Sequence, residues 1–296
     1  MADQLRLSMR HWLQDRVLRA LIWGLLRLPY RMRVPLCGWV TSRVIAPLAG
    51  YRQRIRANLA LVLPDLPEAE VRRIALAVPD NVGRTLIEMY SGDEFVAHAV
   101  GQPLIGPGVQ ALEAAHRAGR PVILVTGHFG NYDAGRAALI ARGYPVGVLY
   151  LPMANRHFND HYVAAISRIG TPLFARGRQG LAEMVRHLRA GGMLGMMVDQ
   201  HMTHGEELTF FGREARTALS AAELALRYDA MLVPTYAVRK ADGLNFDIII
   251  EAPIPAGTPD AMTQALNDSL EAMVRRHLDQ WLWIHRRWKV RRGAKA

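Results

Sequence analysis

The sequence predicts an α/β protein with a mostly parallel central sheet flanked by helices, preceded by a helical part. Two features support this prediction. After residue 100, short apolar runs alternate with helix-like segments, the order of elements that produces parallel strands. These runs also lack polar alternation, as expected for strands that are buried on both faces. We therefore expect a helical region over residues 1–100 and an α/β domain over residues 101–296, which ends in a basic tail rich in tryptophan and arginine.

The helical region is expected to contain four segments separated by prolines and turn residues. Pro29 ends the first segment, because proline lacks a backbone N–H and clashes with the preceding turn. Pro67 fits the start of the fourth segment, where the missing N–H has no helical partner in any case, and Pro79 predicts a break inside it. The four segments are residues 4–27, 35–48, 51–63 and 67–90.

The α/β domain is expected to alternate buried strands with covering helices. The predicted strands are residues 122–125, 146–149, 172–174, 193–198, 231–238 and 246–250. The predicted helices are residues 107–118, 134–142, 156–169, 179–189, 217–228 and 261–278. In an open parallel sheet, functional sites gather at the carboxyl ends of the strands. The residues that follow each strand are therefore the first to consider.

The first predicted strand, residues 122–125, leads into a glycine-rich turn that carries a histidine. Gly127 and Gly130 bracket His128, so the backbone can turn sharply there without a steric penalty from a Cβ atom. A helix follows, with Asn131 or Asp133 in its opening turn. A strand that delivers a histidine into such a turn, directly before a helix, is typical of an active-site edge in an α/β protein.

His128 and Asp133 could act as a pair across this strand-to-helix corner. The carboxylate can accept a hydrogen bond from one ring nitrogen, which fixes the tautomer and leaves the other nitrogen as a general base. The alternative is a histidine at a strand end and an aspartate that favours a helix N-terminus, with no contact between them. An H-x4-D pair is a weak motif by itself, so the residues alone leave both possibilities open.

Three stretches of the sequence resemble one enzyme family. Residues 127–133, Gly-His-Phe-Gly-Asn-Tyr-Asp, are similar to the H-x4-[DE] block of the glycerolipid acyltransferases. More narrowly, they resemble the lipid A biosynthesis late acyltransferases of the lauroyl/myristoyl type. Residues 198–234, which include Val-Asp-Gln and Leu-Thr-Phe-Phe-Gly-Arg, and the tryptophan-rich residues 281–289 resemble the narrower family. Together the similar stretches span most of residues 100–290.

The resemblance implies acyl transfer from acyl carrier protein to a hydroxyl of a lipid A precursor, a secondary acylation in lipopolysaccharide biosynthesis. His128 would take the hydroxyl proton during attack on the donor thioester, and Asp133 would orient and charge-stabilise the imidazole. The sequence has no G-x-S-x-G motif and no cysteine near His128, so no acyl-enzyme is expected. The oxyanion would be met by backbone N–H groups of the turn, at Gly127, Gly130 and Asn131, or by an arginine.

The same resemblance implies further substrate-binding residues. Arg168 and Arg176 are similar to the family's arginine block, which implies contact with a phosphate or with the oxyanion. The alternative for each is a solvated arginine at the end of an element. Asp199 follows a strongly apolar strand, and the resemblance places it beside the acceptor, with Gln200 carried over more loosely.

A loop further along the chain is the last substrate-binding candidate. Phe211, Gly212 and Arg213 supply an aromatic ring, a turn glycine and a cation. The resemblance implies that this loop faces the substrate. The alternative is ordinary hydrophobic packing of the ring beside a surface arginine.

No metal ion or other cofactor is expected. Two histidine pairs, His157 with His161 and His201 with His204, have spacings that could suit a metal, but zinc needs three or four converging ligands. The sequence fixes no third ligand for either pair. The single cysteine, Cys37, excludes a clustered cysteine site.

The net charge of +11 is concentrated at the two ends of the chain. Residues 1–60 contain 11 basic and 2 acidic residues, and residues 275–296 contain 8 basic and 1 acidic. Two basic ends around a mildly acidic body predict docking onto an anionic surface. A membrane and a nucleic acid both offer such a surface.

The N-terminal segment favours the membrane. Leucine and tryptophan alternate with arginine over residues 4–27, which predicts an interfacial amphipathic helix. The longest uncharged run, residues 20–26, is far shorter than the ~20 residues that a spanning helix needs, and the segment lacks a signal-peptide cleavage site. A core helix of a soluble protein is the alternative. The tryptophan–arginine tail, residues 281–292, is likewise expected at a membrane interface, although such a tail could also bind single-stranded nucleic acid.

The resemblance and the charge pattern together define the expected partners. They are acyl carrier protein as the donor, a membrane glycolipid as the acceptor and an anionic membrane surface, without nucleic acid. The expected location is the cytoplasmic face of a bacterial inner membrane, with peripheral or monotopic attachment through the N-terminal segment. The alternatives are an acyltransferase for a glycerolipid or a phosphoinositide mannoside, and a non-catalytic membrane-binding scaffold.

Overall fold

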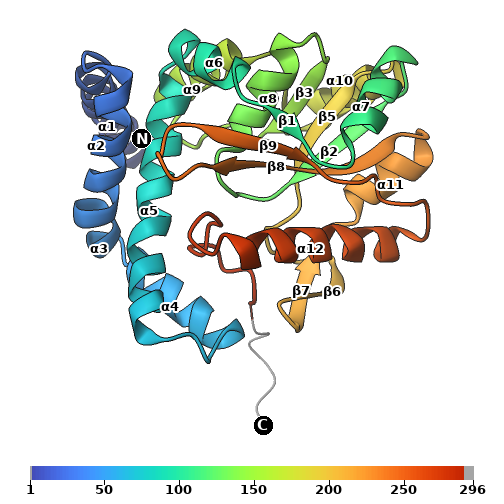
Figure 1. The fold of residues 1–296 in the computed structure, drawn as a ribbon. Helices are drawn as coiled ribbons and strands as arrows, with labels where there is room; N and C mark the ends of the chain where they lie inside the picture. Colours follow the sequence, from blue (N-terminus) through green and yellow to red (C-terminus); the bar gives the residue numbers. More distant parts are fainter. Residues whose placement is uncertain (1, 290–296) are drawn as a thin grey trace.

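The structure, a computed structural model, describes residues 2–289, with the side chains of residue 9 and residues 11–289. Its centre is a seven-stranded sheet, which confirms the predicted α/β fold with a mostly parallel sheet flanked by helices (Figure 1). Each long apolar run forms a strand because it can bury both faces between helices. The strands are β1 (Leu104–Ile105), β2 (Val122–Thr126), β3 (Val146–Tyr150), β4 (Leu173–Ala175), β5 (Met193–Met197), β8 (Met231–Arg239) and β9 (Phe246–Ile250).

The strand order places β2 at the centre of the sheet. The order is β1-β9-β8-β2-β5-β3-β4, and every neighbouring pair is parallel except β8 and β9. β2 lies between β8 and β5, so its carboxyl end opens between two other strands. The residues after β2 and β5 therefore meet at one edge of the sheet.

Helices cover both faces of the sheet, and alternate residues of β2 point to opposite faces. Val122 and Leu124 pack in one hydrophobic cluster with α7 (Val109–Arg117), α8 (Tyr132–Ala141) and α9 (Arg156–Ile169). Ile123 and Val125 pack in another with α10 (Arg178–Arg189), α11 (Ser220–Arg227) and α12 (Pro259–Arg276). Figure 1 shows α8 and α12 on opposite sides of the sheet. This two-sided burial accounts for the absence of polar alternation in the strands.

The N-terminal region is helical, as predicted, and it packs beside the sheet (Figure 1). The predicted break at Pro79 is wrong, because the long helix continues through it. Its buried face, which includes Ile74 and Val78, packs well enough to outweigh the hydrogen bond that proline removes. The helices are α1 (Ala2–Leu26), α2 (Tyr30–Val40), a π-helical turn (Thr41–Ile45), α3 (Ala46–Leu48), α4 (Tyr51–Val62), α5 (Glu68–Tyr90) and α6 (Asp93–Val100).

Helix α1 exposes many large apolar side chains, but it is not amphipathic in the predicted sense. Its exposed apolar residues are spread around most of the helix instead of forming one stripe, and arginines lie among them. The residues are Met9, Trp12, Leu13, Val17, Leu18, Leu21 and Trp23. Among the described residues, no helix has the length and apolar character needed to span a membrane.

The C-terminal part contains two features that differ from the sequence-based expectations. A short antiparallel hairpin, β6 (Glu206–Phe210) and β7 (Arg213–Thr217), lies where a loop was expected. Trp281 and Trp283 are fully buried, so their predicted place at a lipid interface is wrong. They pack against the rings of the hairpin, where burial of such large apolar surfaces is most favourable. Arg291 and Arg292 of the predicted tail lie outside the described residues.

Candidate active site

The carboxyl ends of β2 and β5 bring His128 and Asp199 together. Thr126 pairs with Met197 across the two parallel strands, and each of the two site residues lies two positions beyond this pair. The imidazole Nδ1 of His128 lies 2.8 Å from Oδ1 of Asp199. The backbone N–H of His128 donates to Oδ2 of the same carboxylate at 2.7 Å. These contacts fix both the main chain and the ring of the histidine against one carboxylate.

Asp199 is fully buried, and its charge is compensated by hydrogen-bond donors. The indole N–H of Trp281 donates to Oδ2 at 2.9 Å. Burial disfavours the charged carboxylate, but the charge and hydrogen bonds of His128 outweigh it and hold the pKa of Asp199 far below its usual range. Burial also opposes protonation of His128, yet the Asp199 carboxylate raises the pKa of the imidazole above its ordinary value. An ionised Asp199 that accepts from Nδ1–H leaves Nε2 of His128 as the basic nitrogen.

Asp133 does not orient His128, which corrects the pairing predicted from the H-x4-D spacing. Its carboxylate instead forms a buried ion pair with Arg136, at 3.0 Å, one turn along α8. The guanidinium also donates to the carbonyl oxygens of Ile166 and Gly170. Residues three apart face each other on a helix, whereas the turn before α8 carries His128 towards β5.

The turn after β2 is held by backbone hydrogen bonds that occupy its N–H groups. The four N–H groups of residues 128–131 donate, in order, to the Asp199 carboxylate and to the carbonyl oxygens of Gly127, Gln280 and Ala237. The prediction that Gly130 and Asn131 supply N–H donors to the oxyanion is therefore wrong. Gly130 is needed for another reason: its φ is +54°, and a Cβ would lie 1.9 Å from the Ala237 carbonyl oxygen. A Cβ at Gly127 would lie 3.0 Å from Oδ2 of Asp199.

A largely apolar cavity of about 490 Å³ opens beside the dyad, with His128 in its wall. The Asp133–Arg136 pair also borders it, together with the rings of Tyr132 and Tyr162. Half of the lining residues are aliphatic or methionine, and many of them come from the central strands and from α8 and α9. Examples are Leu124, Leu139, Val146, Val148, Ile166 and Met196. A histidine base at the wall of an apolar cavity suits a reaction on a hydrophobic substrate.

Two of the predicted substrate-binding residues line this cavity. Arg176, after β4, and Gln200, after β5, both face it, as expected for residues at the carboxyl ends of parallel strands. Arg168 is an exposed residue near the end of α9 and is absent from the lining. The structure therefore supports the solvated alternative for Arg168.

The predicted substrate-facing loop lies elsewhere. Phe211 and Gly212 form the tip of the β6–β7 hairpin, and none of residues 211–213 lines the cavity. Phe211 is buried against Trp283, and the guanidinium Nε of Arg213 donates to the Leu61 carbonyl oxygen on the surface. This is the packing alternative, and it corrects the substrate-facing assignment.

The sequence did not predict that the C-terminal segment, residues 277–289, contributes side chains to the site. Besides the Trp281 contact, the ring of His285 lies edge-on to that of His128, with centroids 4.6 Å apart. Burial, followed by the charge of His128, lowers the pKa of His285 to about 4, so it is neutral near pH 7. Arg287 is fully buried and donates to the carbonyl oxygen of Gln200. The family resemblance of residues 281–289 was the available signal, but their tryptophans and arginines pointed to a membrane.

Among the described residues, one group has the side chains for a metal ion. The potential ligand atoms of His128, Asp199 and His285 lie within 4.8 Å of one another. However, Nδ1 of His128 and both carboxylate oxygens of Asp199 already form the contacts that align the dyad. A metal ion would have to replace them, so the arrangement fits a hydrogen-bonded base better than a metal centre.

Comparison with known proteins shows the family to which the chain belongs. The family model for bacterial lipid A biosynthesis acyltransferases matches residues 2–290. A lipid A biosynthesis palmitoleoyltransferase from Escherichia coli K12 is 27% identical over 95% of this chain and 92% of its own length. A phosphatidylinositol mannoside acyltransferase from Mycobacterium tuberculosis is 25% identical over 81% of this chain and 78% of its own. A lipid A biosynthesis lauroyltransferase from Escherichia coli K12 is 23% identical over 91% of this chain and 89% of its own length. The chain belongs to the family of bacterial lipid A biosynthesis acyltransferases.

Proposed function

We propose that this protein transfers a fatty acyl chain from acyl carrier protein to a hydroxyl of a lipid A precursor. His128 is the general base and Asp199 orients it, without an acyl-enzyme. The observation that carries the proposal is the buried His128–Asp199 dyad at the wall of a largely apolar cavity of about 490 Å³. The cavity accepts the acyl chain, and the dyad acts at its reactive end.

The dyad geometry supports a single direct transfer. With Nδ1–H donated to Asp199, Nε2 of His128 takes the proton of the acceptor hydroxyl as its oxygen attacks the thioester carbonyl. The tetrahedral intermediate then collapses, the C–S bond breaks, and the imidazolium returns its proton to the leaving thiolate. Because the backbone N–H groups of residues 128–131 are occupied, we assign the oxyanion contact to a side chain, and Arg176 is the candidate at the cavity.

The names of the relatives support two classes of acceptor. Two of the similar Escherichia coli proteins are named for lipid A biosynthesis, which favours a hydroxyl of a lipid A precursor. The mycobacterial relatives are named for phosphatidylinositol mannoside, which makes that glycolipid the second candidate. Both are membrane lipids with anionic groups, and the basic N-terminal helices suit attachment to such a membrane. We place the protein on the cytoplasmic face of a bacterial inner membrane, where acyl carrier protein is available.

Acyl transfer in detergent or vesicles tests the function directly. Labelled acyl carrier protein is the donor and a tetra-acylated lipid A precursor is the acceptor, with phosphatidylinositol mannoside and acyl coenzyme A as alternative substrates. We expect product from the wild type and a loss of about 100-fold or more in His128→Ala and in Asp199→Asn.

Asp133→Asn provides the contrast within the same motif. We expect it to lower the temperature of unfolding, because Arg136 loses its buried partner, while turnover per folded enzyme changes much less than in Asp199→Asn. Full activity of His128→Ala would overturn the mechanism but retain the substrate. No transfer to either lipid acceptor, with vesicle binding intact, would favour a membrane-binding scaffold.

A further inference from the structure

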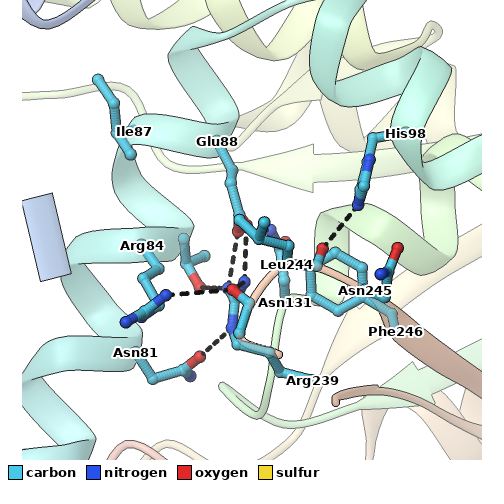
Figure 2. Close-up of polar contacts among 12 residues, drawn as sticks. Asn81, Arg84, Ile87, Glu88, His98, Asn131, Arg239, Leu244, Asn245 and Phe246 are labelled. Atoms are coloured by element: carbon cyan, nitrogen blue, oxygen red, sulfur yellow. Dashed lines mark hydrogen bonds and ion pairs between the residues drawn. The ribbon is translucent and has the colours of Figure 1, made fainter. Parts of the chain in front are cut away.

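A second buried ion pair lies behind the catalytic turn, away from the cavity. Glu88 of α5 is fully buried, and Arg239 at the end of β8 is nearly so. The guanidinium donates to both carboxylate oxygens, at 2.6 Å and 2.7 Å (Figure 2). Its Nε donates to the Asn81 side-chain oxygen at 2.7 Å, and its face lies over the ring of Phe246. Every side of this arginine is therefore held.

The same pair reaches the turn that carries His128. The side-chain amide of Asn131 donates to Glu88 at 2.7 Å, as Figure 2 shows. The Gly130 carbonyl oxygen accepts from the Asn81 amide at 3.0 Å and from the Thr85 hydroxyl at 3.2 Å. One face of α5 thus binds the two residues that end the turn.

The C-terminal segment completes the attachment of the turn. The side-chain amide of Gln280 accepts from the backbone N–H of Arg239 and donates to the Arg239 carbonyl oxygen. The backbone carbonyl oxygen of Gln280 accepts from the Gly130 N–H. At the other end, the His128 carbonyl oxygen accepts from the Leu282 N–H. The turn is therefore fixed from α5, from β8 and from the C-terminal segment at once.

A buried ion pair is a costly way to stabilise a fold. Removing two charges from water costs as much as their attraction returns, so apolar residues of the same size stabilise at least as well. What this pair provides is a defined geometry: a bidentate contact with further donors on the same oxygens allows one arrangement only. It lies at the turn where a displacement of His128 would matter most.

We propose that Glu88 and Arg239 are positioning residues for His128, which act through Asn131 and Gly130 and touch no substrate. This inference rests on the proposed function of the dyad. Helix α5 of the N-terminal region then takes part in catalysis, because it sets the angle at which the turn presents the imidazole to the cavity.

The central test compares Glu88→Gln with Glu94→Gln. Glu94 is exposed and pairs with Arg33 in the same helical region without a hydrogen bond to the turn, so it is the control for losing an ion pair away from the turn. After the folded fraction has been measured by thermal unfolding, we expect Glu88→Gln to lower kcat about 10- to 100-fold with KM within about twofold. Glu94→Gln should keep both constants within about twofold of the wild type.

Two milder variants keep the test decisive if Glu88→Gln folds poorly. Thr85→Val removes one donor to Gly130, and we expect kcat to fall several-fold in a fully folded protein. Arg239→Lys keeps the charge but cannot bind in a bidentate way, and it should match Glu88→Gln. Wild-type kcat in folded Thr85→Val and Arg239→Lys would overturn the proposal.

Histidine ¹⁵N resonances separate this proposal from the proposed function. The ring signals of His128, assigned by their loss in His128→Ala, should shift in Glu88→Gln and stay in place in Glu94→Gln. Unshifted His128 signals in folded Glu88→Gln would overturn the positioning role. If the wild type transfers no acyl group, the proposed function fails, and these shifts still report whether the pair positions His128.

Discussion

Asp199 determines the protonation state and the direction of His128. Its carboxylate accepts hydrogen bonds from the ring N–H and the backbone N–H of the histidine and from the indole N–H of Trp281. The carboxylate is ionised because these donors outweigh the cost of burial. A neutral residue of the same shape could keep part of this geometry but would lose the charge that favours the imidazolium. The pH dependence of turnover reports that loss.

We predict that kcat/KM rises with pH through the pKa of His128, which lies above its ordinary value. Burial opposes protonation, and the Asp199 carboxylate more than compensates for it. A general base acts in its neutral form, so activity falls as pH drops below that pKa. In Asp199→Asn the burial remains and the charge is gone, so the acid limb should move to lower pH while the rate falls. A pH profile of both proteins measures this, and an unmoved limb would contradict the role of Asp199.

The residues of the site were partly predictable. His128 and Asp199 were both identified at strand ends, because apolar strands and their flanking polar residues are visible in the sequence. Their pairing was not, since it depends on the register of β2 with β5, which no local pattern encodes. The H-x4-D spacing and the family resemblance indicate Asp133 instead, because both describe residues that are close in the chain. Glu88 and Arg239 are 151 residues apart in the chain, so their pairing was equally impossible to predict from local sequence patterns.

At the scale of elements, apolar runs were the reliable signal. The strands of the seven-stranded sheet lie largely where the apolar runs predicted them, whereas the β6–β7 hairpin was not predicted. β6 exposes most of its side chains, including Glu206 and Glu207, so it lacks the apolar run of a buried strand. Helix α5 shows the opposite error, because tertiary packing kept a proline-containing helix whole.

Helix α8 offers a direct test of the acyl-chain cavity. Gly135 lines the cavity, and a Cβ there would meet only ordinary contacts, at 3.8 Å from Ile248. The Cβ of Gly135→Leu fits on the helix, which gains about 1 kcal/mol of helix propensity, and we expect the rest of the leucine side chain to occupy part of the cavity. We expect kcat/KM to fall more for long-chain than for short-chain donors. An equal fall for every chain length would argue against an acyl chain in this cavity.

At the scale of the whole molecule, the N-terminal helices connect the exposed apolar surface of α1 to the elements around the His128–Asp199 dyad. Helix α1 contacts α9, where Arg19 donates to the His157 carbonyl oxygen at 2.6 Å and the Asn155 amide donates to the His11 carbonyl oxygen. Helix α9 in turn supplies Tyr162 to the cavity wall. On the other side, α5 binds the catalytic turn. Attachment to a membrane through α1 would therefore hold the cavity close to its lipid substrate.

We predict that the exposed tryptophans of α1 contribute to membrane binding. Trp12 is 47% exposed and Trp23 is 61% exposed, and each lies under an arginine guanidinium that can reach lipid phosphates. Trp12→Ala/Trp23→Ala should lower the partition coefficient on anionic vesicles about 10-fold or more, because apolar area is lost from the interface. Wild-type binding should also weaken as salt rises.

The matched control for this surface is Leu226→Ala, which removes an exposed apolar side chain from α11. It should bind vesicles as the wild type does, and both variants should keep their turnover on a detergent-dispersed acceptor. If the tryptophan variant unfolds instead of losing affinity, α1 is a packing helix of the fold. If the folded tryptophan variant still binds vesicles with wild-type affinity, residues other than Trp12 and Trp23 make the membrane contact. A loss confined to vesicles would identify α1 as the element that brings the dyad to its lipid.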